Sequence, residues 1–174
     1  MSETRAAIER AVQTHPGLHF RGLARRLEIA PGQVQYHVRR LRSTGDVVAE
    51  SVYGRTHYYP PEYDEWERTA LALLRRETAG DVVAHVLVEE PVRPGDAADA
   101  LGIARSTLEW HLDRLVEHGL VEKRRGARGR VRLAVPQRDR TVELLRDADP
   151  SLGERMVDRF TRLVDGLLDG PRDR

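Results

Sequence analysis

The sequence offers few side chains that could perform catalysis or hold a metal ion. His15 and His19 are four residues apart, the spacing of two metal ligands on one helical face, but Pro16 and Gly17 break that helix between them. The chain has no cysteine, which excludes disulfides and thiolate metal sites and fits a reducing cytoplasm. It also lacks a glycine-rich nucleotide-binding loop and a Ser-His-Asp arrangement. We therefore expect no enzymatic activity, no metal and no cofactor.

The side chains that could recognise a partner are arginines and glutamines within residues 31–44. Val34, Val38 and Leu41 have helical spacing and predict an inward stripe. Gln can pair with adenine through two hydrogen bonds, and Arg can pair with guanine or phosphate, so the opposite face suits DNA better than it suits solvent alone. That face carries Gln33, Gln35, Tyr36, Arg39 and Arg40. Further candidate DNA contacts are Arg25, Arg26 and Arg42, which could hold phosphates, and Arg55.

The elements that carry these residues occur twice. Residues 27–48 return at residues 101–121 with an offset of 74 and no gap, which indicates a duplicated module. His37 coincides with His111, next to the buried stripe, so both are predicted to be structural histidines that form hydrogen bonds near the turn. Other matched pairs are Leu27/Leu101, Ile29/Ile103, Ala30/Ala104, Val34/Leu108, Tyr36/Trp110, Val38/Leu112, Leu41/Leu115, Gly45/Gly119 and Val47/Val121.

Each copy reads as a short helix, a tight turn, a longer helix and a β-hairpin. Pro31 suits the start of the longer helix, and Gly45 is placed to end it in a left-handed conformation. Residues 46–60 are rich in β-forming residues around a Tyr53-Gly54 turn. A helix-turn-helix followed by a hairpin is a winged helix, whose second helix can enter the DNA major groove. The expected fold is mainly α with small β-hairpins (α+β).

The expected organisation is two tandem winged-helix domains joined by a helix, with C-terminal amphipathic helices. The boundaries are 1–60 for the first domain, 61–80 for the connecting helix, 81–136 for the second domain and 137–174 for the C-terminal helices. We expect helices at residues 3–14, 18–27 and 31–44, one helix over about 62–78, a helix that Asp81 caps and that ends near residue 90, and helices at 94–101, 105–118, 138–148 and 152–169.

The last of these helices has an apolar face that needs a partner. It either packs back on the connecting helix or forms a dimer interface, and the pattern does not choose between them. The face consists of Met156, Phe160, Leu163, Val164, Leu167 and Leu168. No apolar run approaches the roughly 18 residues of a membrane span, and no signal peptide precedes the first helix, so we expect a cytoplasmic protein that does not contact membranes.

Charge is distributed unevenly between the two copies. Residues 1–60 hold nine Arg against five acidic residues, whereas residues 81–136 are balanced at nine and nine. The second reading helix has three carboxylates on its outward face, Glu109, Asp113 and Glu117, which would repel phosphate. Its Trp110 is typical of a protein contact. The remaining candidate DNA contacts on this helix are Ser106 and Thr107.

The second hairpin is strongly basic, which predicts that the second domain contacts DNA through its wing. A basic hairpin can follow phosphates or insert an arginine into a narrow minor groove. The alternative is a soluble loop without a ligand. The candidate residues are Lys123, Arg124, Arg125, Arg128, Arg130 and Arg132.

A small-molecule effector is a weaker hypothesis. Five aromatic residues near the junction of the first hairpin and the connecting helix could line a pocket, but packing of the hairpin onto that helix explains them more simply. They are Tyr53, Tyr58, Tyr59, Tyr63 and Trp66.

The chain resembles archaeal tandem winged-helix transcription regulators, related broadly to the MarR and ArsR types. The resemblance covers about residues 5–136 and is carried by HPG at residues 15–17, LARRL at 23–27, APGQVQYHVRRL at 30–41 and ARSTLEWHLDRLVEHGLVEK at 104–123. It implies sequence-specific binding of double-stranded DNA, a homodimer and control of transcription. It gives the recognition role to Gln33, Gln35, Tyr36, Arg39, Ser106, Thr107 and Trp110.

Glu109 and Asp113 depart from the usual polar or basic surface of that family. The alternative function is therefore a winged-helix module that binds protein or associates with chromosomes without reading sequence.

Overall fold

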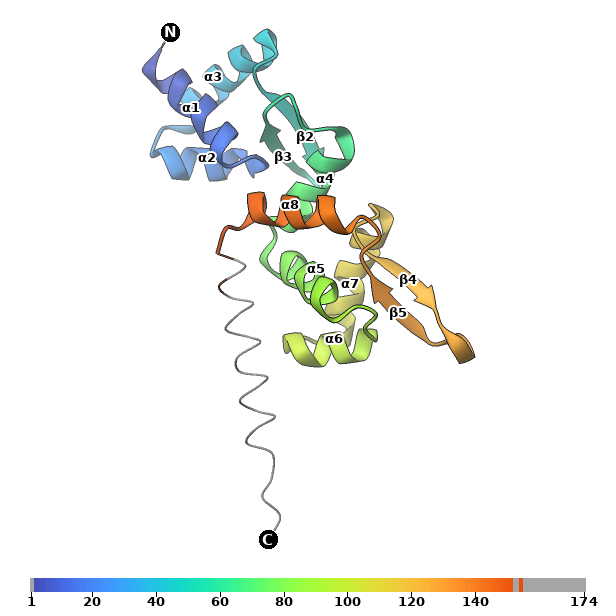
Figure 1. The fold of residues 1–174 in the computed structure, drawn as a ribbon. Coiled ribbons are helices and arrows are strands. Elements are labelled where there is room, and N and C mark those ends of the chain that lie inside the picture. The colour runs from blue at the N-terminus through green and yellow to red at the C-terminus, as the bar shows by residue number, and fades with distance from the viewer. Residues whose placement is uncertain (1, 152–153, 155–174) are drawn as a thin grey trace.

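A computed structural model describes residues 2–151 and residue 154 (Figure 1). The helix expected at residues 152–169 and its apolar face lie outside the described residues. Within the described part, helices alternate with two small antiparallel sheets, which confirms the expected fold class. No helix in this part is long and apolar enough to cross a membrane.

The first module packs three helices against a three-stranded sheet. The helices are α1 (Glu3–Thr14), α2 (Phe20–Leu27) and α3 (Pro31–Thr44). The sheet has the order β1-β3-β2, formed by β1 (Leu18–His19), β2 (Val48–Val52) and β3 (Arg55–Tyr59). Its core is a small cluster that takes one or more apolar residues from each helix, including Ile8, Val12, Leu23, Val34 and Leu41.

The prediction that the second helix begins at residue 18 is wrong. Leu18 and His19 form a short strand that pairs with Tyr58 and His57 of β3. The ring nitrogen Nδ1 of His19 then accepts a hydrogen bond of 3.1 Å from the backbone N–H of Gly22 and caps α2. The histidine that could have been a metal ligand is therefore a helix cap.

The connecting helix ends earlier than expected, and the helix after it begins earlier than expected. α4 (Glu65–Leu74) begins at a capping box formed by Asp64 and Glu67, and α5 begins separately at residue 77 (Glu77–Glu89). A Cβ on Gly80 would lie 2.7 Å from the carbonyl oxygen of Leu74, so glycine allows α5 to fold back close to the end of α4. Asp81 consequently lies inside α5 and is not its cap.

The second module repeats the first with the same offset. Its helices α6 (Pro94–Leu101) and α7 (Arg105–Glu117) begin 74 residues after α2 and α3, and α5 begins 74 residues after α1. The hairpin consists of β4 (Glu122–Arg125) and β5 (Val131–Ala134). A bridge between Val92 and Leu133 stands where β1 pairs with β3 in the first module. The duplication therefore includes the first helix of each module.

The helix α8 (Arg138–Ala148) packs on α4, beside the junction of the two modules (Figure 1). Thr141, Leu144 and Leu145 are buried in this contact. α4 and α8 share one core with the second module, and Tyr59 from β3 of the first module enters that core. The connecting segment is therefore structurally part of the second module, with the first module attached through its sheet.

Candidate nucleic-acid interface

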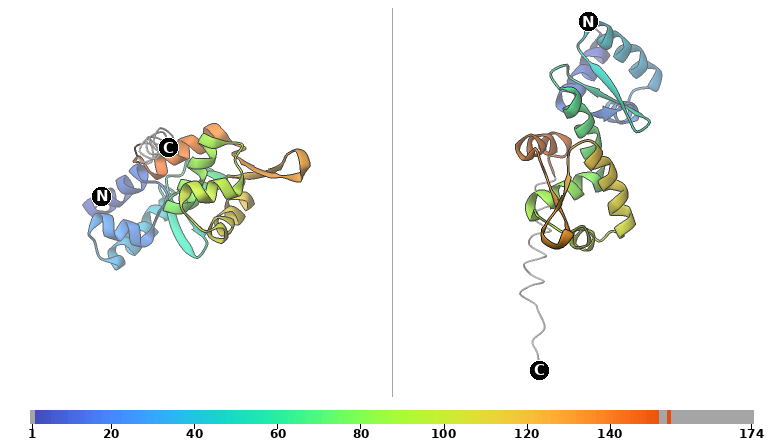
Figure 2. Two further views of the ribbon diagram at one scale, coloured as in Figure 1. Left: turned by 90° about the horizontal axis from the view of Figure 1, so that it is seen from below. Right: turned by 90° about the vertical axis from the view of Figure 1, so that its right-hand side faces the viewer.

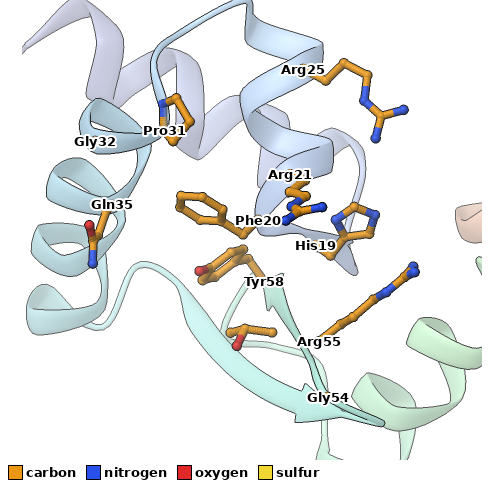
Figure 3. Close-up of a pocket in the computed structure, with 11 residues that line it drawn as sticks. His19, Phe20, Arg21, Arg25, Pro31, Gly32, Gln35, Gly54, Arg55 and Tyr58 are labelled. Atoms are coloured by element: carbon orange, nitrogen blue, oxygen red, sulfur yellow. The ribbon is translucent and has the colours of Figure 1, made fainter.

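A groove of about 850 Å³ lies in the first module between α2, the start of α3 and the β2–β3 hairpin (Figure 3). The turn at residues 28–30 places the start of α3 opposite the hairpin, because Glu28 adopts a left-handed conformation and Pro31 begins the new helix. The groove is lined by His19, Phe20, Arg21, Arg25, Pro31, Gly32, Gln35, Gly54, Arg55, Thr56 and Tyr58.

The walls of this groove are cationic. Arg21 and Arg25 come from α2, and Arg55 comes from the start of β3 on the other side (Figure 3). Burial lowers the pKa of His19, and the charges of Arg55, Arg25 and Arg21 lower it further, which favours the uncharged ring. Three arginine side chains with no acid among the lining residues favour a polyanion such as a nucleic-acid backbone.

The floor of the groove is formed by aromatic side chains. Phe20 and Tyr58 lie between α3 and the sheet (Figure 3), and Tyr58 is buried. Behind them, His57 is buried with its Nδ1 2.7 Å from the carbonyl oxygen of Gly17, and its ring meets that of His19 edge to face at 6.0 Å. Burial lowers the pKa of His57. The contact between His19 and His57 therefore joins β3 of the hairpin to the start of α2.

The outward face of α3 is free. Tyr36 has 57% of its surface exposed, and the neighbouring polar residues of this helix are exposed as well. The structure places Arg25, Gln35 and Arg55 in the groove. The other predicted residues of this module are exposed but do not line it, and these are Gln33, Tyr36, Arg39, Arg40, Arg42 and Arg26.

His37 does not form the hydrogen bond expected of a structural histidine at its Nδ1. That atom is buried with no partner among the described residues, and the ring instead meets Tyr36 edge to face at 5.0 Å. His111 meets Trp110 in the same way at 4.8 Å. The repeated histidine therefore supports the exposed aromatic residue that precedes it. Within the described residues, no cluster of His, Asp or Glu is placed to hold a metal ion.

The second module has a smaller groove, of about 330 Å³, at the equivalent place. Four residues of its lining match residues of the first groove at the offset of 74. These pairs are Arg93/His19, Pro94/Phe20, Gly95/Arg21 and Arg105/Pro31. Arg130, directly before the return strand of the hairpin, completes the arginines of this groove. Three arginines again converge, although Asp96 joins them. Arg21, Arg93 and Arg105 were not among the DNA contacts predicted from the sequence. The offset of 74 gives no signal for the last two, because it places Arg93 on His19 and Arg105 on Pro31.

The exposed start of α7 is less negative than its sequence suggested. Ser106 and Thr107 are exposed. Glu109 is not a free carboxylate, because it accepts a hydrogen bond of 2.8 Å from the Lys123 ammonium and one of 3.2 Å from the Arg105 guanidinium. The hydrogen bond from Lys123 lowers the pKa of Glu109, and that from Arg105 adds to it. Lys123 and Arg105 therefore neutralise the acid that was expected to repel phosphate.

Farther along α7, the outward face contacts the first module. The guanidinium of Arg114 lies 3.5 Å from the centre of the Trp110 ring and 4.4 Å from that of Tyr53, in the β2–β3 turn. The Tyr53 hydroxyl donates a hydrogen bond of 2.7 Å to Glu117. Trp110, which was expected to contact DNA or a protein, thus belongs to a stack that includes the first hairpin.

The other aromatic residues of the junction are also used in packing. Tyr59 is fully buried and donates a hydrogen bond of 2.6 Å to the carbonyl oxygen of Arg68. Trp66 donates one of 2.8 Å to the carbonyl oxygen of His118, and Tyr63 donates one of 2.9 Å to Asp147. These contacts favour the packing explanation over a pocket for a small effector.

The second hairpin projects away from the helices (Figure 2). Lys123, Arg124 and Arg125 on β4 are exposed, as are Arg128 and Arg130 in the loop, whereas Arg132 on β5 is half-buried. Arg124 pairs with Glu122. Arg128 adopts a left-handed conformation with φ 64°, which turns the loop at its tip. The hairpin therefore presents a basic strand and a basic tip.

Comparisons with known proteins agree with this architecture. A family model described as an N-terminal HTH domain matches residues 2–71, and another described as a helix-turn-helix domain matches residues 69–124. An uncharacterized HTH-type transcriptional regulator of Methanocaldococcus jannaschii is 24% identical over 124 residues. That alignment covers 71% of this chain but 31% of the relative, so the chain spans about a third of the relative's length.

Solved structures resemble the chain only distantly. A conserved hypothetical protein from Chlorobium tepidum is 19% identical over 84% of this chain and 98% of its own, with a TM-score of 0.32. The mRNA-binding domain of elongation factor SelB from E. coli is 17% identical over 78% of this chain and 99% of its own, with a TM-score of 0.31. Because both TM-scores are low, these likenesses do not extend to function.

The two matched models meet near residue 70, within α4, and each covers the helix-turn-helix of one module. This agreement confirms the prediction of two helix-turn-helix modules, and the relative from an archaeon agrees with the resemblance found in the sequence. The chain is thus similar to helix-turn-helix proteins and carries one matched helix-turn-helix domain in each module.

Proposed function

We propose that the protein is a transcription regulator that binds double-stranded DNA in a sequence-specific manner. The observation that carries the proposal is the groove lined by Arg21, Arg25 and Arg55 at the start of the exposed helix α3. In a helix-turn-helix, the start of the second helix contacts base edges while neighbouring groups hold the backbone. The name of the archaeal relative supports the regulatory role.

Residues 1–60 form the principal DNA-contacting unit. Gln33 and Gln35 are exposed in the first turns of α3 and have the chemistry to pair with adenine. Arg39 lies one turn farther on and suits guanine or phosphate. The groove arginines and Arg40 hold phosphates, which positions the helix without contributing to sequence preference.

Residues 81–136 form the second DNA-contacting unit, which acts through the groove at Arg93 and Arg105 and through the basic hairpin. Ser106 and Thr107, next to Arg105 in α7, are also exposed and available to DNA. The connecting segment 61–80 and α8 hold the two units together, and we propose a homodimer as the working form. The helices of 137–174 serve either this packing or the dimer. We assign no catalytic role, cofactor or effector.

A second candidate function is protein binding, which the half-exposed Trp110 and the exposed Val116 on α7 favour. Selection from a pool of random duplex DNA, at two salt concentrations, separates the two. An enriched motif supports the regulator, and a two-fold symmetric motif also supports the dimer. Binding without a motif that fades steeply with salt indicates a non-specific role. Absence of binding at both salt concentrations rejects the proposal and favours the protein-binding module.

A further inference from the structure

The turn of the first hairpin contains an unusual residue. Val52 pairs with Arg55 across the hairpin, which leaves Tyr53 and Gly54 as a two-residue loop. Both have positive φ, 47° for Tyr53 and 77° for Gly54. Such loops prefer Asn-Gly, because asparagine tolerates a left-handed backbone and a bulky side chain does not. The tyrosine is therefore a poor choice for the turn itself, and its side chain must be explained by its contacts.

The hydroxyl of Tyr53 contacts the far end of α7 in the second module. It donates a hydrogen bond of 2.7 Å to Oε2 of Glu117 and lies 3.0 Å from Nε2 of His118. The ring of His118 meets the tyrosine ring edge to face at 5.8 Å. These partners are 64 and 65 residues away in sequence, so the contact joins the two modules directly.

The ring of Tyr53 contacts two arginines. The guanidinium carbon of Arg114 lies 4.4 Å from the ring centre, and that of Arg76, between α4 and α5, lies 5.6 Å from it. Arg114 also covers Trp110, and its Nη1 is buried with no hydrogen-bond partner among the described residues. Its charge is therefore held by two aromatic faces, one from each module.

This contact connects the two grooves. Gly54 and Arg55, which follow Tyr53, line the first groove, while Arg105 at the start of α7 lines the second. Tyr53 thus attaches one wall of the first groove to the helix that forms part of the second.

We propose that Tyr53, held by Glu117 and Arg114, is a clasp that fixes the relative placement of the two grooves and thereby sets the spacing between the two DNA segments they contact. The spacing role rests on the proposed function, but the clasp itself does not.

The first test measures the clasp without DNA. Because the chain has no cysteine, Gln13→Cys on α1 and Asp99→Cys on α6, both at exposed positions, allow spin labels to report the distance between the modules. The full chain should give one narrow distance distribution. Tyr53→Asn, which suits the turn better than tyrosine, should broaden it at least twofold, and Tyr53→Phe, which loses only the hydroxyl contacts, should broaden it less. A control variant, Val88→Ala at an exposed site, should leave it narrow. An unchanged width in Tyr53→Asn overturns the clasp.

The second test uses selection from random duplex DNA. The full chain should enrich two sub-motifs at one spacer length, and Tyr53→Asn should enrich the same sub-motifs at several lengths. A single spacer length for both proteins overturns the spacing role. If the full chain enriches no motif, the proposed function fails and the spacing role fails with it, whereas a label distribution that broadens in Tyr53→Asn still establishes the clasp as a contact between modules.

Discussion

The helices α3 and α7 occupy the same place in the two modules but present opposite surfaces. Their buried residues correspond, with Val34, Val38 and Leu41 matching Leu108, Leu112 and Leu115 at the offset of 74. Their exposed residues do not correspond. At the same offset, Gln35 is replaced by Glu109, Arg39 by Asp113 and Ser43 by Glu117. The duplication has kept the positions that fold the module and changed those that meet a partner.

Two of the three changed residues of α7 have partners inside the molecule. Glu109 is held by Lys123 and Arg105, and Glu117 is held by Tyr53. The outward residues of α3 remain exposed to solvent. A helix at the reading position of a winged helix can therefore serve as an attachment point for its neighbour, and its position in the fold alone does not make it a reader.

The largest expected effect comes from substitutions in the buried positions that the two modules share. Leu41→Ala and Leu115→Ala each remove a fully buried side chain at matched positions. Each should lower the free energy of unfolding by about 2–5 kcal/mol, because a cavity remains where the side chain was. Urea denaturation followed by circular dichroism measures this loss. If one of the two variants keeps the stability of the unmodified chain, the two cores are not equivalent.

The next largest effect comes from substitutions on the exposed faces of α3 and α7, where the two modules differ. Arg39→Glu combined with Arg40→Glu should lower the affinity for duplex DNA by roughly 100-fold near 0.1 M salt, and the slope of log affinity against log salt should fall by about two, as two phosphate contacts are lost. Titration of labelled duplex at several salt concentrations measures both quantities. The matched control is Asp113→Asn on α7, which should change affinity by less than about threefold because it removes a single exposed charge. Retained affinity in the double variant would show that α3 is not the reader.

The sequence was sufficient for the helix-turn-helix modules because their apolar spacing is a local property of each helix. Residues 31–44 and 94–101 were predicted with the observed bounds. The break between α4 and α5 was predicted about four residues too late in the chain, because its position depends on the approach of Gly80 to Leu74, which is a tertiary contact. The offset from Glu3 would have given the correct start of α5 at Glu77, but the apolar pattern of residues 62–78 continues through the break.

The candidate site was predictable only in part, for the same reason. Exposure of the α3 face follows from helical periodicity, and Arg25, Gln35 and Arg55 do line one groove. The role of Tyr53 required knowledge of how the modules pack, since Glu117 is 64 residues away. Likewise, Glu109 looked like an unpaired acid in the sequence because its partner Lys123 lies on the following hairpin.

The smallest expected effect comes from replacing Glu109, the α7 carboxylate whose charge Lys123 and Arg105 compensate. Glu109→Gln should lower the free energy of unfolding by less than about 1 kcal/mol at pH 7, because the side chains of Glu109 and Lys123 are each 35% exposed and solvent screens their attraction. The hydrogen bond from Lys123 lowers the pKa of Glu109 in the folded chain, so its stabilisation is present above the ordinary value of 4.5 and is lost as pH falls through the folded-state pKa.

Urea unfolding at pH 7 and pH 3 should therefore show a difference between the unmodified chain and Glu109→Gln at the higher pH and a smaller one at the lower pH. The same substitution releases Lys123 and Arg105 beside the second groove and should raise the affinity for duplex DNA about two- to threefold, because one negative charge is removed next to the phosphates. Unchanged affinity would mean that the second groove does not contact DNA, and the second module would then act through its hairpin tip alone.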